Sequence, residues 1–302
     1  MNSLIKICER RLKVRGRVIR IARLDGDKYM FLDDPVPIVD GLRKGRDRVD
    51  LFTFMQRLPE TAPKFAYPMA WDNLAVLEVS TLDHWRKHQI RSFARNRAGQ
   101  AEKKGVTLRE VPFDESLIRG ISEVYNESPV RQGRPNTHYG KDIETVYKEE
   151  ATFLDHSIFI GAFLGESLIG FVKLVTDETR TQANLMNIVS MIKHRDKAPT
   201  NALIAHSVRA CAERGIRYLV YQNFVYGNKK PDGLTTFKEV NGFQRVDIPR
   251  YYVPLTLIGR LAFQFGLHHR LVDRIPESVA AKFRALRAAW YDRRLPSVTE
   301  AN

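Results

Sequence analysis

The sequence predicts an α+β protein in which helices flank a sheet. Between residues 80 and 256, predicted strands and helices follow one another irregularly, with three strands in succession at Ser157 to Leu164, Leu168 to Thr176 and Asn184 to Met191. A helix and another apolar strand, Arg217 to Phe224, then form a β-α-β crossover. Residues 1–79 predict a small β-rich subdomain, residues 80–256 the main domain, and residues 257–302 a helical C-terminal extension.

Composition excludes several classes of protein. Of 302 residues, 43% are hydrophobic and 28% charged, which is typical of a soluble globular protein. No stretch approaches the ~20 apolar residues of a membrane-spanning helix, and the first residues lack the apolar core of a signal peptide. Cys8 and Cys211 are far apart and fit neither a disulfide framework nor a zinc cluster. We therefore expect a cytoplasmic protein without a bound metal.

The chain is strongly basic. Its net charge is +14 and its pI about 9.8. This balance favours a polyanionic partner but does not choose among nucleic acid, phosphate-bearing cofactors and an anionic membrane face. A basic surface without a function gives the same composition.

The N-terminal residues predict strands and one helix. Basic and apolar residues alternate in the segment Arg10 to Arg20, which is the period of a strand with one basic face. Asp25-Gly26-Asp27 predicts a hairpin turn that leads into a strand at Lys28 to Leu32. A short helix is expected from Pro35 to Gly45, and another strand from Leu51 to Phe54.

A long basic helix is expected from Thr81 to Lys104, because Asp83 lies in its first turn and Gly105 follows its end. Such a helix can contact phosphates, although a solvated charged surface gives the same pattern. His84 and His88 are four residues apart, but no third ligand accompanies them, so we expect no metal site there.

The β-α-β crossover contains a turn suited to anions. Lys193, His194, Arg195 and Lys197 precede a helix that begins at Pro199. The first N–H groups of a helix have no partner within the helix, and its dipole favours negative charge at that end. An ordinary crossover with a solvated basic turn explains the same residues.

The loop Tyr125 to Asp142 is a second candidate site, because it is dense in titratable side chains. Glu127 or His138 can act as the base that removes a proton from an attacking amine or hydroxyl. Arginines here can hold a carboxylate or phosphate bidentately. The candidates for substrate binding, together with a tyrosine just past the crossover, are Arg131, Gln132, Arg134, Tyr139 and Tyr226. A flexible solvated loop has the same composition.

Residues 80–255 resemble the GCN5-related N-acetyltransferase (GNAT) fold, and in particular its FemAB-like branch. The order of elements carries the resemblance, together with three segments: RNRAGQAEKKGV at 95–106, HRDKAPTNAL at 194–203 and FKEVNGF at 237–243. The resemblance implies a mixed, mostly antiparallel central sheet flanked by helices, and an acyltransferase. It places the acceptor over the 127–142 loop.

The resemblance also implies roles for individual residues. Acyl-CoA phosphates would lie on the turn and helix formed by Arg195, Lys197, Ala198, Thr200, Asn201 and Ala202. The turn departs from the family pattern R-x-x-G-x-G/A, because Ala198 and Thr200 replace the two glycines. Lys238 stands where the usual general-acid tyrosine lies, and Tyr251 can replace that tyrosine or pack in the sheet. Phe237-Lys238 is similar to a segment of FemAB-like transferases, which take an aminoacyl group from tRNA.

Three functions therefore remain open. The first is acyl transfer from acyl-CoA to an amine or hydroxyl of a small-molecule, glycan or peptide acceptor. The second is a FemAB-like transferase with tRNA as partner and aminoacyl-tRNA as donor. The third is a non-catalytic module that binds nucleic acid or an anionic membrane, with residues 257–302 suited to peripheral membrane contact.

Overall fold

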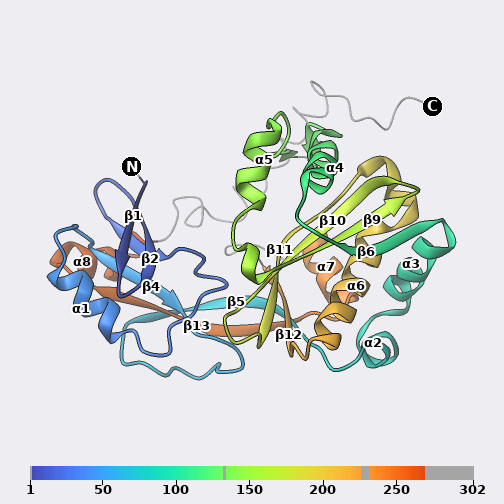
Figure 1. Ribbon diagram of the computed structural model, residues 1–302. Helices are drawn as coiled ribbons and strands as arrows, with labels where there is room; N and C mark the ends of the chain where they lie inside the picture. The colour runs from blue at the N-terminus through green and yellow to red at the C-terminus, as the bar shows by residue number, and fades with distance from the viewer. Residues whose placement is uncertain (1, 132–133, 226–231, 269–302) are drawn as a thin grey trace. The chain divides into compact units, whose positions relative to one another are not determined.

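The computed structural model describes residues 2–131, 134–225 and 232–268 (Figure 1). The chain divides into two compact units. Of the described residues, the first comprises 2–75, 223–225 and 245–268, and the second 76–131, 134–222 and 232–244. None of the helices in the described ranges has the length and apolar character needed to span a bilayer.

The first unit is a sheet with two helices. Its strands lie in the order β1-β2-β3-β4-β13-β5. Their bounds are β1 Asn2–Ile7, β2 Arg10–Arg15, β3 Ile21–Leu24, β4 Leu51–Met55, β5 Met69–Glu78 and β13 Gln244–Pro254. The helices are α1 Val36–Lys44 and α8 Leu257–Gln264. β3 and β4 pair parallel, whereas β2 pairs antiparallel with β1 and β3, and β4 with β13.

The core of this unit lies between the sheet and α1. Leu12 and Val14 of β2 are buried, whereas Lys13 between them is half-buried and the flanking Arg11 and Arg15 are exposed, which confirms the alternation predicted for this strand. The expected helix near Pro35 and the strand near Leu51 are confirmed as α1 and β4.

The predicted hairpin strand at Lys28 to Leu32 is wrong. Those residues form turns, in which Tyr29 and Met30 donate backbone hydrogen bonds to the Gly26 carbonyl. Tyr29 and Phe31 are buried, as the alternation of the segment predicts, but the segment is not a strand of the sheet. The apolar residues of this stretch therefore fill the core from a loop, and β3 before the turn takes the place in the sheet.

The second unit contains the other five strands of the same sheet, in the order β12-β11-β10-β9-β6. The strands are β6 Val106–Val111, β9 Ser157–Leu164, β10 Ser167–Thr176, β11 Gln182–Ser190 and β12 Tyr218–Asn223. β6, β9, β10 and β11 pair antiparallel in sequence, and β11 pairs parallel with β12. The mixed, mostly antiparallel sheet is thus confirmed.

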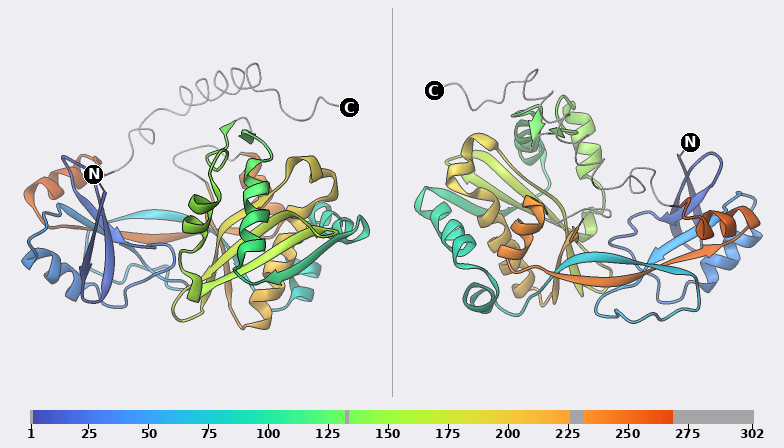
Figure 2. Two further views of the ribbon diagram at one scale, coloured as in Figure 1. Left: turned by 45° about the horizontal axis from the view of Figure 1, so that its top comes forward. Right: turned by 180° about the vertical axis from the view of Figure 1, so that it is seen from behind.

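Helices cover both faces of this sheet (Figures 1 and 2). On one face lie α4 Glu115–Asn126 and α5 Ile143–Glu150, whose apolar side chains pack with those of β9 and β10. On the other lie α3 Ser92–Lys103 and α6 Pro199–Glu213. Shorter elements are α2 Leu82–His84, η1 Trp85–Gln89, β7 Val130–Arg131, β8 Arg134–Pro135, η2 Leu154–His156, η3 Ile192–Lys197 and α7 Gly233–Val240.

The helix expected from Thr81 to Lys104 is interrupted. α2 and the π-helical turn η1 end at Ile90, which is extended (φ −85°, ψ 139°), and α3 begins at Ser92. Trp85 is buried and its indole N–H donates to the Asn241 carbonyl, while the Arg91 N–H donates to the Val240 carbonyl. Contacts with a segment about 150 residues later therefore override the local helical pattern.

Candidate active site

The sheet opens between β11 and β12. The two strands pair only from Gln182 opposite Tyr218 to Asn184 opposite Val220, although β11 continues to Ser190. Beyond the paired part, the Gln222 side chain reaches across to the Leu185 carbonyl at 3.4 Å. Beyond Asn184, the edge of β11 that faces β12 is therefore no longer paired with that strand.

The end of β11 leads directly into the predicted phosphate turn. Ala198, between η3 and α6, is buried and left-handed (φ 52°, ψ 42°). A residue with a Cβ adopts this conformation at a cost of roughly 1–2 kcal/mol, which explains why the family loop carries glycine here. The Thr200 hydroxyl lies 2.6 Å from that of Ser190, so it ties the first turn of α6 to β11.

The remaining residues of the predicted cofactor site lie in and around the same turn. Arg195 is exposed, and Lys197 lies 3.4 Å from Asp196. The Asn201 amide contacts Asn241 at the end of α7 at 3.4 Å, and the Ala202 N–H donates to the Ala198 carbonyl.

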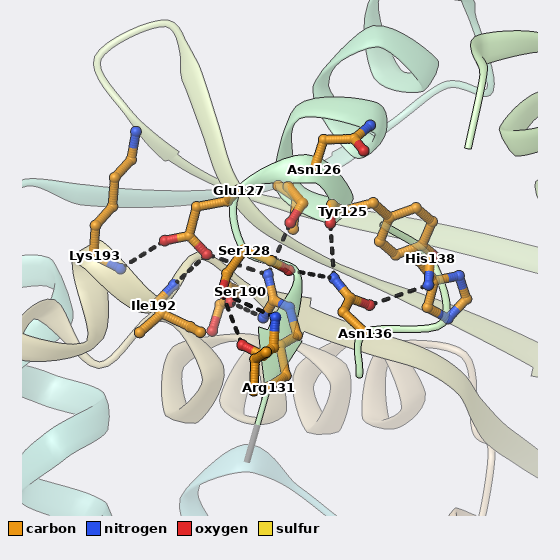
Figure 3. Close-up of polar contacts among 12 residues, drawn as sticks. Tyr125, Asn126, Glu127, Ser128, Arg131, Asn136, His138, Ser190, Ile192 and Lys193 are labelled. Carbon is orange, nitrogen blue, oxygen red and sulfur yellow. Dashed lines mark hydrogen bonds and ion pairs between the residues drawn. The ribbon is translucent and has the colours of Figure 1, made fainter. Parts of the chain in front are cut away.

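Glu127 joins the predicted acceptor loop to the predicted phosphate turn (Figure 3). One of its carboxylate oxygens accepts from the Ile192 N–H and the other from the Lys193 N–H, each at 2.8 Å. The side chain of Glu127 is 6% exposed. The structure therefore brings the two sequence-predicted sites together, with this carboxylate as a clamp between them.

Arg131 completes this junction. Its guanidinium donates to the Ser190 carbonyl at 2.7 Å and to the Val124 carbonyl at 2.8 Å, and lies 3.4 Å from Glu127. These contacts occupy the groups that the sequence assigned to a bound carboxylate or phosphate. In the conformation described, Arg131 anchors the acceptor loop on the end of β11.

Asn136 shapes the acceptor loop and was not identified from the sequence. Its amide nitrogen donates to the Tyr125 and Ser128 carbonyls at 2.8 and 3.0 Å, and its oxygen accepts from the His138 N–H at 3.1 Å (Figure 3). An asparagine that bonds the backbone two residues later is an Asx turn. The spacing of Asn136 and His138 was the signal that could have revealed it.

His138 is held over Tyr125, with the ring centroids 4.1 Å apart. Burial lowers the pKa of His138 below its usual value, and nearby Lys141 lowers it further, while Glu149 opposes both. The ring is therefore neutral at physiological pH, which is the form that a general base needs. The Lys141 ammonium can only donate, so at this 3.4 Å contact the neutral ring carries its hydrogen on Nε2, and Nδ1 is its basic nitrogen. Glu149 holds the same ammonium more closely, at 2.6 and 2.7 Å, so an acceptor that displaces the long contact can give its proton to Nδ1.

If His138 is the base of the acyl transfer expected from the sequence, the rate of that reaction in the wild type should depend on pH below neutrality. Its lowered pKa keeps the neutral form present down to that pKa, so kcat/KM should fall only as pH drops through a midpoint below 6.5. His138→Gln should lower kcat/KM about 10²-fold and abolish this acid limb. Initial rates from pH 5 to 8 measure both, and an acid limb that persists in the variant would rule out His138 as its source.

A network of buried polar side chains holds Tyr125, at the start of the acceptor loop. The Tyr125 hydroxyl donates to Glu150 at 2.8 Å, and the Asn187 amide donates to the same oxygen at 2.8 Å. Lys173, which is fully buried, donates to the Glu150 and Thr152 carbonyls at 2.6 and 2.7 Å. Burial raises the pKa of Tyr125 and of Glu150, and lowers that of Lys173 to about 8. Lys173 and Asn187 of this network lie in segments that the sequence predicts as apolar strands, so the network was not expected.

Lys238 lies on α7 and is fully buried. Asp232 caps this helix by accepting from the Leu234 and Thr235 N–H groups. The Lys238 ammonium lies 4.9 Å from the ring centroid of Tyr221 on β12, the strand that separates from β11. The lysine predicted from FKEVNGF therefore contacts a side chain of the strand that separates from β11. A buried ammonium is costly, and such groups concentrate at functional sites.

The other predicted residues are distributed differently. Tyr251 is fully buried in the first unit, where its ring stacks on Phe54 and its hydroxyl donates to Gln56 and accepts from the Lys64 N–H. This position gives Tyr251 a packing role, the second of the two roles expected for it. Arg134 and Tyr139 are exposed on the acceptor loop. Gln132 and Tyr226 lie outside the described residues.

His84 and His88 lie with their ring centroids 5.0 Å apart. Within residues 2–131, 134–225 and 232–268, no cluster of three or more His, Cys, Asp or Glu side chains is arranged to hold a metal.

No protein-family model and no curated protein matches the chain. Solved structures do match it along most of its length. L-PGS from Bacillus licheniformis has a TM-score of 0.58 at 14% identity, covering 86% of this chain and 88% of that one. The C-terminal DUF2156 domain of a putative lysylphosphatidylglycerol synthetase from Agrobacterium fabrum has a TM-score of 0.57 at 12% identity, covering 87% of each chain. FemX has a TM-score of 0.58 at 9% identity, covering 87% of this chain and 90% of that one. These likenesses confirm the predicted GNAT-like, FemAB-like fold.

Proposed function

We propose that this chain is an acyltransferase that takes an aminoacyl group from tRNA and transfers it to an amine or hydroxyl acceptor. The choice of donor rests on one observation: several N–H groups of the turn at 192–202 are already hydrogen-bonded within this chain. The fold supports a transferase, the resemblance to FemAB-like transferases implies the aminoacyl-tRNA donor, and the net charge of +14 suits a nucleic acid partner.

The turn at 192–202 leaves few of its N–H groups for a CoA pyrophosphate. Close approach of a pyrophosphate needs several unoccupied N–H groups and small residues. Here the Ile192 and Lys193 N–H groups are bonded to Glu127, the Ala198 N–H donates to Arg195, and Pro199 has no N–H. The exposed side chains of Lys193 and Arg195 remain available for the more widely spaced phosphates of a tRNA terminus.

The opening between β11 and β12 suits the reacting ester. In the proposed reaction the acceptor nitrogen or oxygen attacks the ester carbonyl, and the resulting oxyanion is stabilised by hydrogen bonds before the terminal ribose oxygen of the tRNA leaves with a proton. We propose that two kinds of group stabilise this oxyanion: main-chain N–H groups of β11 beyond Asn184, and the buried ammonium of Lys238. His138 is the proposed base on the acceptor side.

The names of the similar structures guide the choice of acceptor. One is a putative lysylphosphatidylglycerol synthetase, a name that describes a lysyl lipid as product. A lipid hydroxyl therefore joins the peptide, glycan and small-molecule acceptors expected from the sequence. The acyl-CoA donor expected from the sequence is the competing proposal, and the same experiment distinguishes the two.

The test compares both donors on the full chain. Fluorescently labelled deacylated tRNA should bind with an affinity that falls steeply with salt, because bound tRNA releases counterions. Neither acetyl-CoA nor longer acyl-CoAs, each at about 1 mM, should raise the melting temperature. In parallel, loss of label from [14C]aminoacyl-tRNA pools in the presence of lipid, peptide and amino-sugar acceptors reports transfer.

Arg195→Glu should weaken tRNA binding about tenfold and reduce its salt dependence by about one counterion. Arg119→Glu is the matched control, because Arg119 is an exposed arginine of the same unit on α4. It should bind tRNA as the wild type does. Saturable stabilisation by an acyl-CoA that Arg195→Glu abolishes, without tRNA binding, would overturn the tRNA proposal and establish the CoA donor.

A further inference from the structure

The last described helix, α8, presents its large apolar side chains to solvent. Gly259 and Ala262 are buried and Phe263 is half-buried, whereas the other large apolar residues are exposed: Leu257 at 74%, Ile258 at 44%, Leu261 at 50% and Phe265, just past the helix, at 70%. A helix on a soluble protein usually buries its large apolar residues and exposes polar ones. In α8 this arrangement is inverted.

The orientation of α8 is fixed by its contact with Asp50. The Thr256 hydroxyl caps the helix by accepting from the Gly259 N–H and donates to the Asp50 carboxylate at 2.8 Å. A Cβ on Gly259 would lie 1.7 Å from the Asp50 carbonyl oxygen, so only glycine allows this approach. On the inner side, Phe263 and Tyr252 have ring centroids 5.4 Å apart. Rotation of α8 to bury Leu257 and Leu261 would break all these contacts.

Basic residues lie near the first turn of α8, which contacts Asp50. Asp50 also binds the Arg20 N–H and the Arg48 guanidinium, and Arg48 donates to the carbonyl of Val18, which is 77% exposed. α8 lies beside α1 in every view, and α1 ends in a basic segment (Figures 1 and 2). The exposed basic residues at the ends of β2 and α1, in the loops that follow them and on α8 are Arg15, Arg17, Arg43, Lys44, Arg46, Arg48 and Arg260. The exposed Asp47 is the acidic residue among them.

We propose that α8, together with Val18, docks this chain on the surface of an anionic lipid bilayer. Apolar side chains on one side of a helix with a basic border are the composition of interfacial helices, whose apolar side chains enter the acyl boundary while Arg and Lys meet anionic headgroups. Because the exposed residues near these apolar side chains are mostly basic, an anionic bilayer fits them better than an apolar groove on another protein does. The inference does not depend on the transfer reaction, because docking needs neither donor nor acceptor chemistry.

The first experiment is flotation of the full chain with vesicles of pure phosphatidylcholine and of phosphatidylcholine containing phosphatidylglycerol. The chain should bind only the anionic vesicles. Leu261→Ser/Phe265→Ser should lower the partition coefficient at least about tenfold, because two inserted side chains are lost. Tyr147→Ser is the matched control, since Tyr147 is a similarly exposed aromatic residue (51%) on the acidic helix α5, and it should bind like the wild type.

The second experiment follows a fluorophore on the same helix face. In a Cys8→Ser/Leu261→Cys chain labelled with an environment-sensitive dye, emission should shift to the blue only when phosphatidylglycerol vesicles are added. Cys211 is buried and should not react. Blue-shifted emission already present without vesicles would overturn the proposal, because another part of the chain or a second copy would then cover α8. Equal binding to both vesicle types, or unchanged binding of the double serine variant, would also overturn it.

Discussion

Replacement of Lys238 by methionine should lower kcat of the proposed transfer about 10²- to 10³-fold. Methionine keeps most of the apolar stem but removes the ammonium next to Tyr221, at the edge of the opening between β11 and β12. Removal of one preorganised group that stabilises a developing oxyanion has an effect of this size. The measurement is the single-turnover rate at which label leaves [14C]aminoacyl-tRNA, with circular dichroism to verify the fold.

Lys173→Met provides the matched control, because Lys173 is the other fully buried lysine among the described residues. Its ammonium bonds the Glu150 and Thr152 carbonyls, so its loss leaves buried acceptors without a donor and should lower the free energy of unfolding by about 3 kcal/mol. The rate of the folded fraction should change much less than in Lys238→Met. Equal rate losses in the two variants would contradict a catalytic role for Lys238.

Glu127→Ala should lower the free energy of unfolding by about 3–5 kcal/mol. The substitution removes two hydrogen bonds from the Ile192 and Lys193 N–H groups to a charged oxygen, and it leaves the partly buried Arg131 without its carboxylate. Urea unfolding measured by fluorescence gives this value. Because the clamp also positions the 192–202 turn, tRNA binding should weaken in the same variant.

Two variants calibrate this result. Glu127→Gln retains one acceptor oxygen and should lose only about 1–2 kcal/mol. Glu123→Ala removes an exposed glutamate from α4, the helix that ends just before Glu127, and should stay within about 0.5 kcal/mol of the wild type. A loss below 1 kcal/mol in Glu127→Ala would show that the carboxylate does not hold the loop and the turn together.

The candidate site illustrates how far local patterns reach. The basic turn before α6 and the polar loop after α4 were both visible in the sequence as separate segments. Their contact depends on Glu127 and Arg131 meeting residues about 60 positions later, and no local period encodes such a meeting. Arg131 was expected to bind a carboxylate or phosphate of the substrate, but in the conformation described its guanidinium is bonded to main-chain carbonyls.

The sequence by itself determined the order of elements from β6 to β13, the apolar face of β2, the crossover through α6 and the likeness to a GNAT-like fold. Those features depend on periodicity and on residues close in the chain, whose energetics are local. Only the tertiary structure decided where the helix after Thr81 breaks, how Glu127 is used, and which side of α8 faces solvent. Each of these results from a contact between distant segments: Trp85 with Asn241, Glu127 with Ile192, and Gly259 with Asp50. Burial and close approach at those contacts outweigh the local preference of about 1 kcal/mol or less per residue.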